Sequence, residues 1–133
     1  MVVAACYFPA LEDMLAAASG EGCQWNGQEA LVSLTETGSL DVAHRGFLEK
    51  LKAKADTICG YCDCYGHALV ATGRCEVMLD PVMNPWDCGG FFPIVEEAGE
   101  SFTDWSGRKY IYGGSAVSTN GSLFDEVMAL SEL

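Results

Sequence analysis

The sequence predicts an α/β fold in which a mixed, mostly parallel sheet with flanking helices follows a short antiparallel meander. Two observations predict this order. Short apolar runs separated by tight-turn residues fill the first part of the chain, which is typical of antiparallel strands. From about residue 57, strand patterns alternate with helical patterns, which indicates a largely parallel sheet covered by helices. We therefore expect a meander at 1–34, a linker and helix at 35–56, and an α/β domain at 57–133.

The meander is predicted from its apolar runs and turns. Residues 2–7 form a strand pattern that ends at Phe8-Pro9, and a second apolar run covers 14–18. Asn26-Gly27, after Trp25, is the strongest short hairpin signal, and residues 29–33 supply the return strand. A meander of this size is too small to form a complete sheet domain, so we expect it to be the remnant of a larger domain whose preceding segment is missing.

The α/β region is predicted from its start and stop signals. A polar loop at 34–40 and a helix at 41–54 precede it. Asn84-Pro85 pairs an N-cap with proline at the first helical position and opens a helix that runs to Gly99. Gly73 is a C-terminal stop for the helix before it. The remaining predicted elements are helices at 63–72 and 121–130 and strands at 75–80, 101–105 and 115–118.

The charge balance limits the function. The net charge of −12, from 19 acidic and 7 basic residues, excludes nucleic-acid binding by charge neutralisation. A phosphorylated substrate would also be repelled unless divalent metal ions bridged carboxylates and phosphate oxygens. The apolar runs are too short to span a bilayer, and no signal or transit pattern is visible. We expect no membrane partner and a cytoplasmic or plastid location.

The seven cysteines, an odd number, lie mostly among apolar residues. This pattern is typical of buried thiols in a reducing compartment without a disulfide framework. Cys59-Gly-Tyr-Cys62 has the spacing of a redox motif, so a thiol-redox or metal-binding module that uses Cys59 and Cys62 is one alternative function. His67, with apolar neighbours, is expected to be structural. The three tryptophans are expected to anchor packing.

The candidate site lies where a strand passes into a helix. Asp80 ends the predicted strand, and Asp87 lies in the first turn of the next helix. In an open parallel sheet, ligands collect at the carboxyl ends of strands and the amino ends of helices. Both carboxylates would then face one crevice. Alternatively, Asp87 only stabilises the dipole of its helix, and the spacing does not decide between the two.

Six segments resemble one known family. Trp86-Asp87-x3-Phe-Phe-Pro-Ile-Val-Glu-Glu-Ala-Gly99 resembles the second signature of the inositol monophosphatase superfamily. The segment from Asp63 to Asp87 is similar to the histidinol-phosphatase branch in particular. Further matches along nearly the whole chain are Pro9-Ala-Leu-Glu-Asp-Met14, Gly20-Glu-Gly22-x2-Trp-Asn-Gly27, Phe102-Thr-Asp-Trp105 and Ser118-Thr-Asn120-Gly.

The resemblance implies a Mg²⁺-dependent phosphomonoester hydrolase that converts histidinol phosphate to histidinol and phosphate in histidine biosynthesis. It implies that Asp87 ligates the metal and that Asp80 contacts the organic part of the substrate, where an acid suits a cationic amine. Cys62, Asp63 and Cys64 would line the substrate pocket. The partner would be a small phosphorylated metabolite.

The chain also departs from the family pattern. The first signature, of the type Asp-Pro-x-Asp-Gly-Thr, and the Glu-Glu pair before it are absent from their expected places. No catalytic set is therefore complete in these residues, and we expect the chain alone to be inactive. A non-catalytic truncated paralogue or interaction subunit is the second alternative. We also expect a homodimer or association with the missing N-terminal segment.

Overall fold

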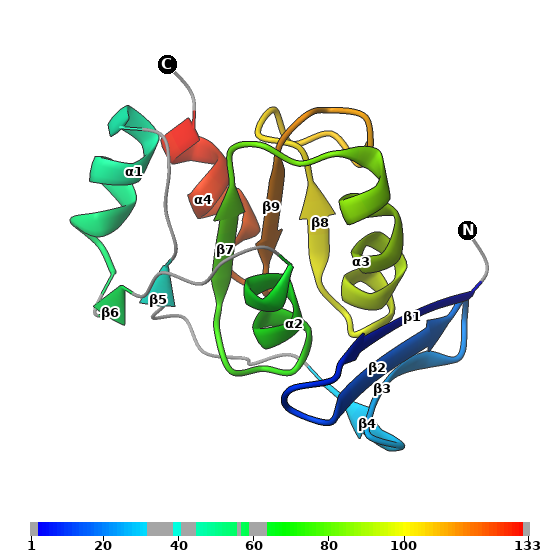
Figure 1. Cartoon of the computed structure of the whole chain (residues 1–133). Helices are drawn as coiled ribbons and strands as arrows, with labels where there is room; N and C mark the ends of the chain where they lie inside the picture. Colours follow the sequence, from blue (N-terminus) through cyan, green and yellow to red (C-terminus); the bar gives the residue numbers. More distant parts are fainter. Residues whose placement is uncertain (1–2, 32–38, 41–44, 56, 59–63, 132–133) are drawn as a thin grey trace.

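The computed structural model describes residues 3–31, 39–40, 45–55, 57–58 and 64–131, and it contains two sheets (Figure 1). The first is a four-stranded antiparallel meander in the order β1-β2-β3-β4. Its strands are β1 (Val3–Phe8), β2 (Asp13–Ala18), β3 (Gly22–Trp25) and β4 (Gln28–Ala30). The predicted hairpin is confirmed. Asn26 and Gly27 have φ values of 51° and 79°, and Trp25 pairs with Gln28 on either side of them.

The second sheet is mixed, in the order β6-β5-β7-β9-β8. Its strands are β5 (Ser39–Leu40), β6 (Thr57–Ile58), β7 (Val77–Asp80), β8 (Ser101–Thr103) and β9 (Ala116–Thr119). β5 pairs in parallel with β6 and β7, whereas β9 pairs antiparallel with β7 and β8. Four strands therefore share one direction, as predicted, and β9 runs against them. β5 lies within the segment predicted to be a polar loop.

Helices cover both faces of this sheet. They are α1 (Arg45–Lys52), α2 (Tyr65–Ala71), α3 (Pro85–Glu97) and α4 (Phe124–Ser131). On one face, α1 and α4 bury Phe47, Leu51 and Val127 against Val77 and Val117. On the other face, α2 packs on β7, and α3 packs on β8 (Figure 1). No helix in the described part of the chain is long and apolar enough to cross a membrane.

The meander and the α/β region share one hydrophobic core. The inner face of the meander, which includes Ala4, Leu15 and Cys23, is buried in the same cluster as Phe91 and Ile94 of α3. Successive side chains of a strand point to opposite faces, so β1 and β2 each bury one face against α3. The opposite face is uncovered within the described residues, where Val3 and Tyr7 are 66% and 52% exposed.

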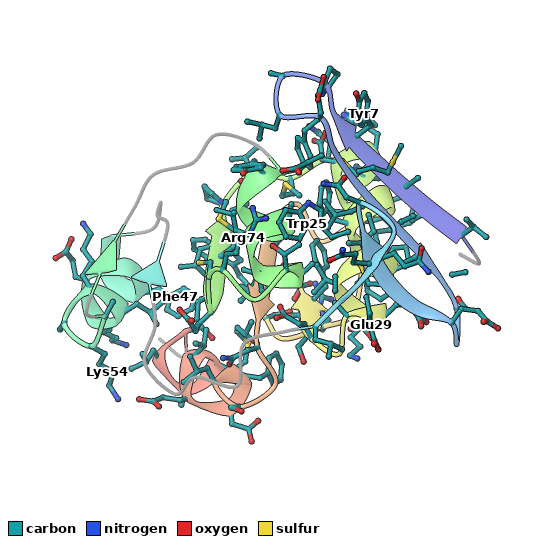
Figure 2. The ribbon with its side chains drawn as sticks, turned by 90° about the horizontal axis from the view of Figure 1, so that it is seen from below. Tyr7, Trp25, Glu29, Phe47, Lys54 and Arg74 are labelled. Atoms are coloured by element: carbon teal, nitrogen blue, oxygen red, sulfur yellow. The ribbon has the colours of Figure 1, made fainter. Side chains whose placement is uncertain are left out.

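A second contact joins β3 of the meander to the turn between α2 and β7. The guanidinium of Arg74 lies 3.6 Å from the centre of the Trp25 ring, and the two side chains lie next to each other in Figure 2. The indole N–H of Trp25 donates to Asp13 Oδ1 at 2.9 Å, which fixes the plane of the ring. A cation held over an indole face is attracted by the quadrupole of the ring, so this contact supports the docking of the two sheets.

Candidate active site

The elbow between β7 and α3 positions both candidate carboxylates. β7 ends at Asp80, and α3 begins at Pro85 after Asn84, whose φ and ψ of −93° and 158° are those of an extended N-cap. Pro85 occupies the first helical position, where its missing N–H costs no hydrogen bond. The predicted helix start is thereby confirmed. The first turn of α3 carries Asp87 to the same end of the sheet at which Asp80 lies (Figure 1).

Asp87 is oriented by its own helix start. Its Oδ2 accepts hydrogen bonds from the backbone N–H and the side-chain amide of Asn84, both at 3.2 Å, which completes a capping box. The side chain is partly exposed, and no described residue donates a hydrogen bond to Oδ1. Asp87 therefore caps its helix, as the structural interpretation requires, and also presents one carboxylate oxygen for a ligand.

Asp80 lies close to this helix start. Its Oδ1 accepts a hydrogen bond from the backbone N–H of Val82 at 3.1 Å. The charges of Asp87 and Asp80 both act on the buried thiol of Cys88. Burial first, and then these two charges, raise the pKa of Cys88 to about 11. The two carboxylates therefore share one neighbourhood, and Cys88 stays a neutral thiol near both.

Of the three remaining candidates, the structure places Cys64. This residue precedes α2, and its Sγ lies 4.0 Å from the backbone carbonyl oxygen of Asp87. Cys62 and Asp63 lie outside the described residues, as do Cys59 and the redox spacing that it forms with Cys62. None of the five described cysteines forms a disulfide. The structure thus brings Asp80, Asp87 and Cys64 together at one helix start.

The described residues provide some of the ligands of a metal site. Carboxylate oxygens are the ligands that Mg²⁺ prefers, and Asp87 offers one that is oriented and accessible. A group of three or more histidine, cysteine, aspartate or glutamate side chains that could hold a metal is absent from the described part of the chain. These residues could contribute ligands to a magnesium site but do not complete one.

Sequence reasoning assigned no role to Asp104, although the segment between β8 and β9 borders the same end of the sheet (Figure 1). Asp104 is buried there and accepts hydrogen bonds from the backbone N–H groups of Ser106 and Arg108 at 2.9 and 3.0 Å. Arg108 also forms an ion pair with it at 2.7 Å. Burial alone would raise the pKa of Asp104, but the hydrogen bonds from Ser106 and Arg108 outweigh burial and hold it below its usual value.

This segment is tied to the elbow, because the backbone N–H of Met83 donates to the carbonyl oxygen of Gly114 at 3.0 Å. Exposed apolar side chains occur in both parts. Trp86 in the first turn of α3 is 78% exposed, and Tyr110 and Tyr112 pack with ring centres 5.5 Å apart. The expectation that Trp86 anchors packing is therefore wrong. The first turn of α3 points this side chain away from the core.

His67 is buried, as predicted for a structural histidine, although its Nε2 has no hydrogen-bond partner among the described residues. It is fully buried, and its Nδ1 lies 2.6 Å from Ser118 Oγ. The rings of Phe91 and Phe102 lie nearby, with centres 6.2 and 5.2 Å from the imidazole centre. Burial lowers the pKa of His67 to about 3, so the ring is neutral near pH 7.

The fold and the elbow together define an α/β chain that presents paired carboxylates at a strand-to-helix junction. A family model described as the inositol monophosphatase family matches residues 1–132, so the chain belongs to this family. The resemblance inferred from the Trp86-Asp87 signature is confirmed.

Individual relatives agree with this assignment. The chain is 38% identical over 135 residues to a histidinol-phosphatase of Chlorobaculum parvum, in a match that covers 92% of this chain and 52% of the relative. It is 30% identical over 131 residues to a fructose-1,6-bisphosphatase/inositol-1-monophosphatase of Thermotoga maritima, covering 90% and 51%. The structure of the extragenic suppressor protein SuhB of Bartonella henselae shares the fold, with a TM-score of 0.91 at 21% identity over 99% of this chain and 59% of that one. The chain thus spans about half the length of these two curated relatives.

Proposed function

We propose that this chain supplies one side of a phosphomonoester-hydrolase site whose substrate is histidinol phosphate. The observation that supports this proposal most is the geometry of the elbow. There, Asn84 fixes Asp87 through one carboxylate oxygen and leaves the other for a ligand, and Asp80 lies nearby. The histidinol-phosphatase of Chlorobaculum parvum, 38% identical to this chain, supports this substrate. The elbow is also the place where an open sheet of this kind binds ligands.

Each residue has a distinct role in this proposal. Asp87 would hold a Mg²⁺ ion, because its capping hydrogen bonds engage only one of its two carboxylate oxygens. The negative charge of Asp80 attracts the positively charged ammonium group of the substrate at short range. Cys64, with Cys62 and Asp63 before it, borders the organic part of the substrate. Mg²⁺ supplies the positive charge that brings a phosphate group to a chain of net charge −12.

We further propose that the 133 residues do not turn over substrate alone. The sequence lacks the Asp-Pro-x-Asp-Gly-Thr segment and has no Glu-Glu pair in the place where the family has it, and the described residues contain no group of three metal-binding side chains. The prediction is that phosphate release from histidinol phosphate with Mg²⁺ stays at the level of a protein-free control. Turnover similar to that of a full-length relative, lost in Asp87→Asn, would contradict this part of the proposal.

Binding tests the roles separately from turnover. In the presence of Mg²⁺, we expect Asp80→Asn to weaken the binding of histidinol phosphate about fivefold. The reason is the loss of about 1 kcal/mol of charge attraction to the ammonium group. Inositol monophosphate, which has no amine, should bind Asp80→Asn as it binds the parent chain. Asp87→Asn should weaken both ligands. Asp125→Asn, which removes an exposed charge on α4, is the matched control.

Chemical-shift titration of labelled protein would measure these weak affinities. If Asp80→Asn weakened the binding of histidinol phosphate and of inositol monophosphate equally, Asp80 would not recognise the amine. If neither Asp80→Asn nor Asp87→Asn changed binding, the elbow would not be the substrate site.

A further inference from the structure

Three polar side chains form a row across the second sheet, at the end opposite the elbow. Val77 of β7 and Ser101 of β8 both pair with Thr119 of β9, so one position further Glu76 and Glu100 lie on either side of Asn120. The backbone N–H of Asn120 donates to the carbonyl oxygen of Glu76 at 2.9 Å, which continues the ladder to this row. Figure 1 shows the start of β7, the end of β9 and the turn before β8 at this end of the sheet.

The row is buried although two of its members are acidic. Glu100 is 5% exposed and Asn120 is fully buried, whereas Glu76 is partly exposed and opens the row toward solvent. The side chains alternate along each strand, so all three point to the face on which Met78 and Phe102 pack against α2 and α3. Neither carboxylate oxygen of Glu100 has a hydrogen-bond partner among the described residues.

An orphaned buried carboxylate needs a counter-group. Removing an ionised carboxylate from water without a partner is costly, so the group binds a proton or a cation instead. Burial first, and then the charge of Glu76, raise the pKa of Glu100 to about 8. Asn120 contributes a neutral oxygen, Oδ1, which accepts the backbone N–H of Leu123 at 3.1 Å.

We propose that Glu76, Asn120 and Glu100 form a binding site for a hard divalent cation of the Ca²⁺ type. Every side-chain donor that the row offers is oxygen, which excludes preference for the softer transition metals. Two carboxylates carry the charge that one divalent ion neutralises. Ca²⁺ accepts irregular sets of carboxylate, amide and water oxygens, whereas Mg²⁺ requires near-octahedral geometry and keeps most of its water.

The cation and a proton compete for Glu100. At low pH the buried acid is neutral, and the cation must displace its proton, so binding releases a proton and strengthens as the pH rises. The site lies at the opposite end of the sheet from Asp80 and Asp87 and does not depend on the proposed phosphatase function. The two sites can therefore be separated by mutation.

The experiment uses the Asp87→Asn chain, so that the elbow does not contribute a carboxylate ligand. Thermal melting and calorimetric titration with CaCl₂ are measured at pH 6.0 and pH 8.5. We expect Ca²⁺ to raise the Tm by several degrees at pH 8.5 and by much less at pH 6.0. Glu100→Gln, which mimics the protonated acid, should abolish the shift. Glu76→Gln, on the exposed side of the row, should weaken it, and Glu126→Gln on α4 should leave it unchanged.

Two results would overturn the proposal. One is a Tm at pH 8.5 that Ca²⁺ does not change, which would leave the proton as the only counter-group of Glu100. The other is a Ca²⁺-induced rise in Tm that is equally large in the Asp87→Asn chain with and without Glu100→Gln or Glu76→Gln. This result would place the ion elsewhere. Because Glu76→Gln changes a partly exposed side chain, it keeps the test decisive if Glu100→Gln fails to fold.

Discussion

The carboxylate of Glu97 accepts the backbone N–H of Gly20 at 2.9 and 3.0 Å, across 77 positions of the chain. The same carboxylate accepts the N–H of Gly22 at 3.2 Å. Both glycines have positive φ values, 80° and 78°, which turn their N–H groups toward the end of α3. This contact, with the shared core, holds the meander against the α/β region.

The first prediction concerns this contact. Glu97→Gln should lower the free energy of unfolding by about 1 kcal/mol, because charge-assisted hydrogen bonds become neutral ones in a largely exposed setting. Glu96→Gln at the neighbouring position is the control, since Glu96 pairs with the half-exposed Lys109 and accepts only a long hydrogen bond, 3.4 Å, from the N–H of Phe102, and it should cost less than about 0.5 kcal/mol. Urea unfolding measures both. Equal effects would mean that Glu97 does not fasten the meander.

The second prediction compares two helical glycines. An added Cβ at Gly90 of α3 would meet no atom within 4 Å, so Gly90→Ala should stabilise the chain by about 0.5–1 kcal/mol through helix propensity alone. An added Cβ at Gly66 of α2 would collide with the Met78 side chain, so Gly66→Ala should destabilise it by about 1–3 kcal/mol. Urea midpoints that move in the same direction would refute the packing of α2 on β7.

The third prediction concerns pH in metal-free buffer. The raised pKa of Glu100 means that the folded state binds a proton between about pH 4.5 and 8 that the unfolded state has released, so stability falls as pH rises through this window. The lowered pKa of His67 acts in the opposite way, and stability falls as pH drops from about 6.5 toward 3. Each contribution changes by up to about 1.4 kcal/mol per pH unit.

Together these two groups predict a maximum. Stability should rise as the pH drops from 8.5 to about 6.5, stay nearly level to about 4.5, and fall below that. Glu100→Gln should remove the rise in stability between pH 8.5 and 6.5. In this variant the loss of stability that His67 causes should be visible from about pH 6.5 downward. His67→Gln should instead remove the loss that His67 causes at low pH. Urea unfolding at half-unit intervals gives the profile, and an unchanged alkaline limb in Glu100→Gln would show that Glu100 is not buried as a neutral acid.

Local signals predicted much of the fold. Asn26-Gly27 gave the hairpin, Asn84-Pro85 gave the start of α3, and Gly73, with a φ of 69°, ends α2 where the sequence indicated. Each signal works because one or two residues determine the backbone conformation by themselves. The position of Asp80 and Asp87 at one elbow followed from the same reasoning.

The remaining features depend on contacts between distant segments. β5 has two residues and consists of a pairing with β6 and β7, which no local pattern marks. The row of Glu76, Asn120 and Glu100 exists only because β9 enters between β7 and β8 against their direction. Asp104-x-Ser106-x-Arg108 is a local turn that the sequence could have revealed, since a short acidic side chain often accepts the N–H groups that follow it.

The fourth prediction concerns association. Val3, Tyr7 and Met14 lie on the uncovered face of the meander, and β1 and β4 end the sheet order. Uncovered strand edges and apolar faces favour pairing with another chain. We expect a dimer formed through the meander, or a poorly folded monomer. Sedimentation at several concentrations, with Tyr7→Lys as the disrupting variant, measures this. A cooperatively melting monomer at all concentrations would show that the meander needs no partner.

The most direct test of the proposed function joins this chain to the part of the Chlorobaculum parvum histidinol-phosphatase that it does not match. Mg²⁺-dependent phosphate release from histidinol phosphate is measured for the folded chimera and for its Asp87→Asn and Asp125→Asn variants. The account predicts an active chimera that Asp87→Asn slows by about 100-fold or more and that Asp125→Asn leaves unchanged. A cooperatively folded chimera that releases no phosphate, or one whose rate does not depend on Asp87, would contradict it.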